Sequence, residues 1–154
     1  MGGLIERLYQ QGFKPRLLIG ANSYPAGDDI RLVQALHKTI GVSCELVYAW
    51  SEHEWLRTID NAVLLISGRF HHTIAAAFLR TPFLVMGSNT KKIDGLSEIL
   101  RIPTYVSSEE DNLSEVLFES AIKLTKDPMK GILDNGAREE MLDLSLQNFS
   151  RLSH

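Results

Sequence analysis

Short, strongly apolar runs alternate with segments of helical periodicity along most of this chain. Between the runs, apolar residues recur three or four positions apart, as Trp55 and Ile59 do and as Ile93 and Leu96 do. Uninterrupted apolar strands separated by amphipathic helices are typical of a parallel sheet that helices cover on both faces. The pattern therefore predicts an α/β fold with a three-layer, Rossmann-like, doubly wound parallel sheet of about five strands. The expected strands are RLLIG (16–20), CELVYA (44–49), AVLLIS (62–67), FLVMG (83–87) and PTYV (103–106).

Length and composition favour a single Rossmann-like domain, residues 1–154. A chain of 154 residues that is 44% hydrophobic can bury a core of ordinary size. We expect a leading helix over residues 1–12 and a terminal helix over residues 137–152, whose apolar stripe has no strand after it. The terminal helix would pack on a missing domain or a partner, and its apolar surface would favour a homo-oligomer.

The overall charge excludes two classes of partner. With 16 Lys and Arg against 19 Asp and Glu, the formal net charge is -3, so no global field attracts nucleic acid or an anionic membrane. No apolar stretch reaches the roughly 18 residues of a membrane span, because Arg80 interrupts the most apolar region. The first residues also lack the features of a signal peptide. We therefore expect a cytoplasmic protein that recognises anions only locally.

The loop SGRFHH, after the third expected strand, carries the densest group of candidate binding residues. Gly68 would permit a tight exit from the strand, and the helix that follows would offer its first amide groups to an anion. Arg69 has a planar guanidinium that suits phosphate or carboxylate, and His71 or His72 could give or take a proton near neutral pH. A structural role is equally open, with Arg69 in a surface ion pair and the histidines capping the helix.

The loop GSNTKK, after the fourth expected strand, is a second candidate. Ser88, Asn89 and Thr90 are all plausible helix caps, which would place Lys91 and Lys92 in the first turn of the next helix. Cations there oppose the helix macrodipole by up to ~1 kcal/mol each, and a bound anion would remove that penalty. The alternative is that the helix begins later and both lysines are merely solvated.

Neighbouring parallel strands would bring these two loops to one cleft, lined by Arg69, His71 and Lys92. Adjacent residues at a helix start point about 100° apart, so only one of His71 and His72 would face that cleft. We expect no metal, because the segment HEWLR has Arg57 where a zinc-binding helix needs its second histidine. We also expect no organic cofactor, and the segment GANSYPAG lacks the glycine spacing of a dinucleotide-binding fingerprint and the lysine of a P-loop.

Five sequence features follow one another within residues 59–103. They are an apolar strand, an Arg-x-His motif, a small-residue helix, a Pro-led strand and a Lys-x-x-Gly-Leu segment. In order and spacing, this run resembles the carboxyl-terminal signature of the polysaccharide pyruvyl transferases. The positions that carry the resemblance are Arg69, His71, Pro82, Lys92, Gly95 and Leu96.

The resemblance implies one half of a two-domain, glycosyltransferase-like (GT-B) enzyme of exopolysaccharide biosynthesis at the cell envelope. Such enzymes transfer the pyruvyl group of phosphoenolpyruvate to a sugar of a cell-surface glycan or of its lipid-linked precursor. By carry-over, Arg69 would hold the phosphate or carboxylate of phosphoenolpyruvate, His71 would be the general acid, and Lys92 would be a secondary anion contact. Gly68, Ser88, Asn89 and Thr90 would complete the substrate site.

A family enzyme would have an amino-terminal domain of comparable size, so we expect the isolated chain to be inactive without it. Two other functions share this fold and these loops. One is a nucleotide-sugar glycosyltransferase half, and the other is a non-catalytic phosphosugar-binding or scaffold module. The presence of both Arg69 and His71 favours pyruvyl transfer, because phosphate binding alone has no need of an acid.

Overall fold

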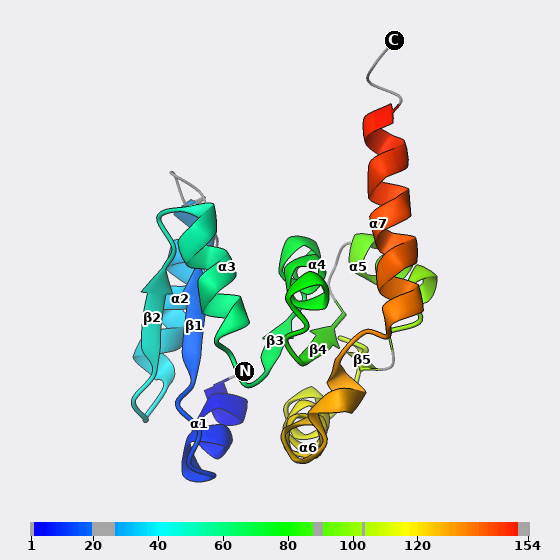
Figure 1. Ribbon diagram of the computed structural model, residues 1–154. Helices are drawn as coiled ribbons and strands as arrows, with labels where there is room; N and C mark the ends of the chain where they lie inside the picture. The colour runs from blue at the N-terminus through cyan, green and yellow to red at the C-terminus, as the bar shows by residue number, and fades with distance from the viewer. Residues whose placement is uncertain (1, 20–26, 88–90, 103, 151–154) are drawn as a thin grey trace.

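Helices and parallel strands alternate along the chain, as the sequence pattern predicts. The computed structural model describes residues 2–19, 27–87, 91–102 and 104–150 (Figure 1). The strands are β1 (Arg16–Ile19), β2 (Glu45–Tyr48), β3 (Leu65–Ser67), β4 (Phe83–Met86) and β5 (Tyr105–Val106). The helices are α1 (Gly2–Gln10), α2 (Gly27–Thr39), α3 (Glu52–Asp60), α4 (Phe70–Leu79), α5 (Lys91–Ile99), α6 (Leu113–Lys126) and α7 (Asn135–Ser150), with a 3-10 turn, η1 (Pro128–Gly131), before α7.

The strands form two parallel sheets, so the prediction of a single sheet is wrong. β1 pairs with β2, and β4 lies between β3 and β5. Figure 1 shows β2, β1, β3, β4 and β5 in this order from left to right, but within the described residues no hydrogen-bond ladder joins β1 to β3. An apolar run indicates which residues are buried and not which backbone groups pair, so the pattern could not reveal this break.

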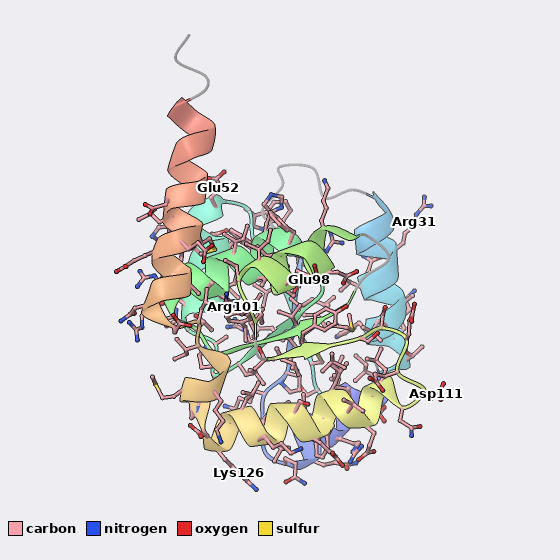
Figure 2. All side chains as sticks on the ribbon, turned by 90° about the vertical axis from the view of Figure 1, so that its right-hand side faces the viewer. Arg31, Glu52, Glu98, Arg101, Asp111 and Lys126 are labelled. Atoms are coloured by element: carbon pink, nitrogen blue, oxygen red, sulfur yellow. The ribbon has the colours of Figure 1, made fainter. Side chains whose placement is uncertain are left out.

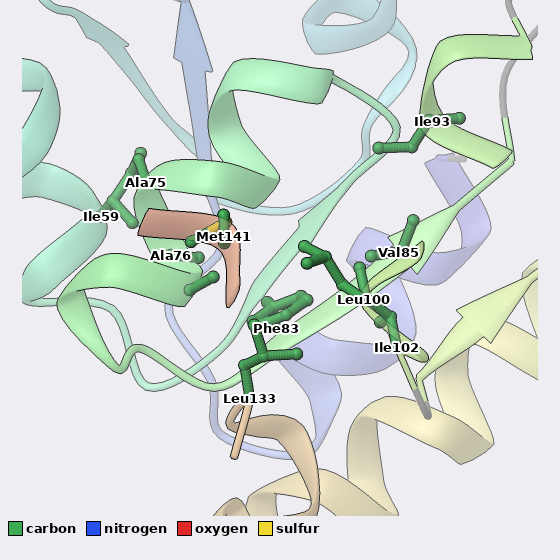
Figure 3. Packing of buried hydrophobic residues seen from close by; sticks show 11 residues of the cluster. Ile59, Ala75, Ala76, Phe83, Val85, Ile93, Leu100, Ile102, Leu133 and Met141 are labelled. Carbon is green, nitrogen blue, oxygen red and sulfur yellow. The ribbon is translucent and has the colours of Figure 1, made fainter. Parts of the chain in front are cut away.

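The strand β4 lies at the centre of the core because both of its faces are covered. Successive side chains of a strand point to opposite faces, so Phe83 and Val85 pack on one side and Leu84 packs on the other. Figure 3 shows the first cluster, to which α3, α4, α5 and α7 contribute. The second cluster is completed by Leu4, Val106, Leu117, Ala121 and Leu124.

Helices therefore cover both faces of the β3–β4–β5 sheet, as the uninterrupted apolar runs predict. Figure 2 shows α5 and α6 on opposite sides of these strands, with labelled charged side chains such as Glu98 and Lys126 at the outer surface. The carboxyl ends of β3 and β4 consequently belong to a layer that is packed from both sides.

An ion pair holds α1 to α6. The guanidinium of Arg7 donates to both carboxylate oxygens of Glu115 and lies 3.8 Å from the ring centroid of Phe118. This hydrogen bonding lowers the pKa of Glu115 below its usual value of 4.5. The helix α1, Gly2–Gln10, lies within the range expected for the leading helix, and Gly12 follows it with a φ of 87°, a left-handed conformation that glycine adopts readily.

The helix α7 lies in the region of the predicted terminal helix and begins two residues earlier, at Asn135. Its first half packs on the chain's own core, since Met141 is buried in the first cluster and Ala137 packs against it. Leu142 is 45% exposed. Packing of the remaining half on another domain or a partner stays a prediction.

Candidate active site

The junction between β3 and α4 is a two-residue turn. Ser67 is the last residue of β3, and α4 begins at Phe70. Arg69 is the N-cap residue, with extended dihedral angles (φ -98°, ψ 127°), and its side chain makes no capping hydrogen bond. The guanidinium is therefore carried by the residue at which the helix starts, next to the first backbone amides of α4.

A buried serine fixes this turn. The Oγ of Ser67 accepts a hydrogen bond from the backbone N–H of Arg69 (3.1 Å) and lies 3.2 Å from Nδ1 of His72. The ring of His72 also packs against that of Trp55 on α3, with 5.5 Å between the ring centroids. Ser67 and His72 are both buried, so these contacts point His72 into the protein.

His71, unlike its neighbour His72, faces solvent. Its side chain is exposed, as is that of Arg69, and its ring makes an edge contact with Phe70 (5.6 Å between centroids, 89° between planes). The first turn of α4 contains no acidic residue. It therefore presents an arginine and an imidazole to solvent beside the positive end of a helix dipole.

A close approach of backbones explains Gly68. A Cβ at this position would lie 2.8 Å from the carbonyl oxygen of Met86, nearer than real Cβ contacts come. Because Ser67 is paired with Val85 in the parallel ladder, the loops after β3 and β4 leave the same edge of the sheet. The structure thus brings the carboxyl ends of β3 and β4 together.

The second loop leads into α5, which begins at Lys91, as predicted. Lys92 is exposed in the first turn of this helix. The same turn contains Asp94, a carboxylate that offsets part of the unfavourable interaction of the lysines with the helix dipole. Ser88, Asn89 and Thr90 lie outside the described residues.

A tyrosine from β5 holds the start of α5. The hydroxyl of Tyr105 donates to the carboxylate of Asp94 (2.7 Å), which raises the pKa of Tyr105. A Cβ on Gly87, at the end of β4, would lie 2.7 Å from this hydroxyl and 2.9 Å from the backbone nitrogen of Ser108. Gly87 thus leaves the space in which Tyr105 reaches Asp94.

Sequence reasoning missed Ser67, Gly87, Tyr105 and Asp94. A serine directly before a glycine at the end of an apolar strand is a signal for a side-chain turn, because its oxygen can accept the amide hydrogen two residues later. No comparable signal marks the Tyr105–Asp94 pair, which connects a strand to a helix that precedes it in the sequence.

Other potential sites are weaker. The hollow lined by Phe78, Asn135, Arg138, Glu139 and Leu142 lies between the last turn of α4 and α7, away from both loops. Within the described ranges, no group of three or more His, Cys, Asp and Glu side chains could hold a metal ion. None of the helices described in the structure is long and apolar enough to cross a membrane.

Comparison with known families gives one match. The family model for polysaccharide pyruvyl transferases matches residues 3–90, more than half of the chain. The match includes β1 to β4 and the Arg-x-His motif, and it ends before Lys92, Gly95 and Leu96. Searches of curated proteins and of solved structures gave no significant match.

Proposed function

Because the chain belongs to the polysaccharide pyruvyl transferase family, we propose that it transfers the pyruvyl group of phosphoenolpyruvate to a sugar of a cell-surface glycan or of its precursor. The observation that carries this proposal is the first turn of α4, where Arg69 and His71 are both exposed on a turn fixed by Ser67. The domain would be one half of a GT-B-like enzyme, with the site at the carboxyl edge of its strands.

Arg69 binds the phosphate or the carboxylate of phosphoenolpyruvate in this proposal. Its planar guanidinium can donate two parallel hydrogen bonds to such a group, and the first amides of α4 and the Gly68 backbone lie beside it. Lys92, at the start of the neighbouring helix, adds a second positive charge. Ser88, Asn89 and Thr90 would supply further donors from the segment between β4 and α5.

His71 is the general acid. It gives a proton to the methylene carbon of phosphoenolpyruvate, which becomes a methyl group. A sugar hydroxyl forms a C–O bond to the adjacent carbon, and the proton that this hydroxyl loses returns to His71. A second hydroxyl of the same sugar then displaces inorganic phosphate and closes the ketal, and its proton leaves with the phosphate. Positioned acids of this kind contribute about 100- to 10,000-fold to the rate. Arg69 and Lys92 stabilise the departing phosphate.

Calorimetric titration of the purified chain with phosphoenolpyruvate tests the proposal. We expect saturable binding that Arg69→Ala weakens by at least about tenfold, because a charge-assisted contact is lost. Arg57→Ala is the matched control, since Arg57 is another exposed arginine but lies in the last turn of α3, at the opposite end of that helix from the loops. Inorganic phosphate and a uridine diphosphate sugar serve as competing ligands, and preference for the nucleotide sugar would contradict the proposal.

A further inference from the structure

Trp50 is the most exposed large apolar side chain of the described residues, at 69%. It lies between the end of β2 and the start of α3, on the carboxyl side of its strand. Its indole is stacked on the ring of Tyr48, with 6.2 Å between centroids and 21° between planes. An isolated exposed aromatic needs no explanation, but a stacked pair at the carboxyl edge of the strands presents a flat, supported surface.

Local helix capping does not account for this side chain. Ser51 caps α3 by accepting the N–H of Glu54, and the carboxylate of Glu54 accepts the N–H of Trp50. In such a capping box, an apolar residue before the cap commonly packs on the fifth residue after it, here Trp55. Trp55 instead packs against His72 while Trp50 stays exposed, so the capping bonds fix the backbone of Trp50 without burying its ring.

The Trp55–His72 contact also places this platform beside the candidate active site. Trp55 lies in the first part of α3 and His72 in the first turn of α4, so the amino-terminal turns of the two helices are neighbours. Trp50 directly precedes one of these turns, and His71 is on the other. Both therefore belong to the same edge of the domain.

The charges around Trp50 select the kind of ligand. Glu52 and Glu54 are exposed in the first turn of α3, and Figure 2 labels Glu52 at the surface. These carboxylates repel phosphate groups, whereas they can accept hydrogen bonds from hydroxyl groups. The anionic donor thus belongs with Arg69 and Lys92, and the surface at Trp50 suits a neutral, hydroxyl-rich ring.

We propose that Trp50, supported by Tyr48, is a stacking site for a pyranose ring. One face of a pyranose carries C–H groups with a small positive charge, which complements the negative face of an indole. Under the proposed function, on which this assignment of the occupant rests, the ring is the acceptor sugar, held beside the phosphoenolpyruvate site by α3.

Saturation-transfer NMR of the full chain with the methyl glycosides of glucose, galactose and mannose, with and without phosphoenolpyruvate, tests this site. We expect at least one glycoside to bind, and we expect the saturation transfer to be strongest for the hydrogens on one face of its ring. Trp50→Ala should weaken that binding by at least about tenfold, and Trp50→Phe, which keeps an aromatic face, should change it by less than about threefold. Val63→Ala is the matched control, because Val63 is 64% exposed but precedes β3, at the amino end of a strand, whereas Trp50 follows the carboxyl end of β2.

The outcomes separate this site from the proposed reaction. Glycoside binding that is equally strong in Trp50→Ala, or no binding of any glycoside in either condition, overturns the stacking site even if phosphoenolpyruvate binds through Arg69. Trp50-dependent glycoside binding without any affinity for phosphoenolpyruvate supports the stacking site and contradicts pyruvyl transfer. A uridine diphosphate sugar that binds more tightly than the glycosides and depends on Trp50 would overturn the assignment to a neutral ring. Circular dichroism of each variant confirms that the fold is retained.

Discussion

The Oγ of Ser67 lies 3.2 Å from Nδ1 of His72, which ties the last residue of β3 to the first turn of α4. Because the same oxygen accepts the N–H of Arg69, one buried hydroxyl fixes the turn that carries both Arg69 and His71. The two exposed groups of the candidate site therefore take their positions from a residue that no ligand needs to touch.

Ser67→Ala should disturb the site as well as the fold. The variant leaves the Arg69 amide and the His72 ring without this partner, so we expect a loss of about 1–3 kcal/mol in the free energy of unfolding. Phosphoenolpyruvate binding should fall by about tenfold, because Arg69 is no longer held in place. Chemical denaturation and calorimetry measure the two effects.

Ser97→Ala is the control for that experiment. Ser97 is buried to the same extent as Ser67, but its hydroxyl donates only to the carbonyl of Ile93 in its own helix. We expect a change in stability of less than about 1 kcal/mol and unchanged binding. Equal effects of the two substitutions on binding would remove Ser67 from the site.

Substitutions of the two adjacent histidines should have different effects, one on stability and the other on turnover. His72 is buried and bonded to Ser67, so His72→Ala should lower the free energy of unfolding by about 1–3 kcal/mol. His71 is exposed, so His71→Ala should leave stability and phosphoenolpyruvate binding nearly unchanged while lowering turnover in the complete enzyme by about 100-fold or more. Full turnover in His71→Ala with none in a folded His72→Ala would show that the acid is the other histidine.

Two glycines should respond oppositely to the same substitution. Gly68→Ala places a Cβ 2.8 Å from the carbonyl oxygen of Met86, so the loops must separate and the melting temperature should fall. Gly95 lies inside α5 with nothing within 4 Å of an added Cβ. Gly95→Ala should therefore stabilise the protein by about 0.5–1 kcal/mol. Thermal unfolding of both variants checks the contrast, and a stable Gly68→Ala would contradict the close approach.

The ion pair between Arg7 and Glu115 predicts a pH dependence. Since the pKa of Glu115 is lowered by its hydrogen bond to Arg7, the pair stabilises the fold above the usual value of 4.5, and this contribution disappears as the pH falls through the lowered pKa. The stability difference between the wild-type chain and Glu115→Gln should thus shrink to zero in acid. Glu98→Gln, at an exposed carboxylate on α5, provides the comparison, and added salt should reduce the Glu115 effect.

The strands could be predicted closely because apolar runs are a local signal. β1, β2 and β4 lie within the predicted ranges and miss them by no more than two residues. β3 begins three residues later than predicted, at Leu65, and Val63 before it is 64% exposed. The division into two sheets could not be predicted. It depends on whether the edges of β1 and β3 pair. That pairing involves residues far apart in the sequence, so neither apolar run indicates it.

The candidate site was partly predictable for the same reason. Gly68, Arg69, His71 and Lys92 follow two strands that pair, and adjacency of parallel strands is what brings such loops together. Trp50 was not recognised, because an aromatic residue beside a strand is usually part of the core, and only its exposure in the structure shows otherwise.

The space left by Gly87 also bears on the register in which β4 pairs with β3 and β5. All four residues of β4 are apolar and both faces of its sheet are covered, so a shift by one position would still bury apolar side chains. Such a shift would, however, bring a Cβ to the point that lies 2.7 Å from the Tyr105 hydroxyl. The absence of a side chain at this one position therefore favours a single register for the strand, in which the carboxyl end of β4 lies beside the end of β3 that leads to Arg69.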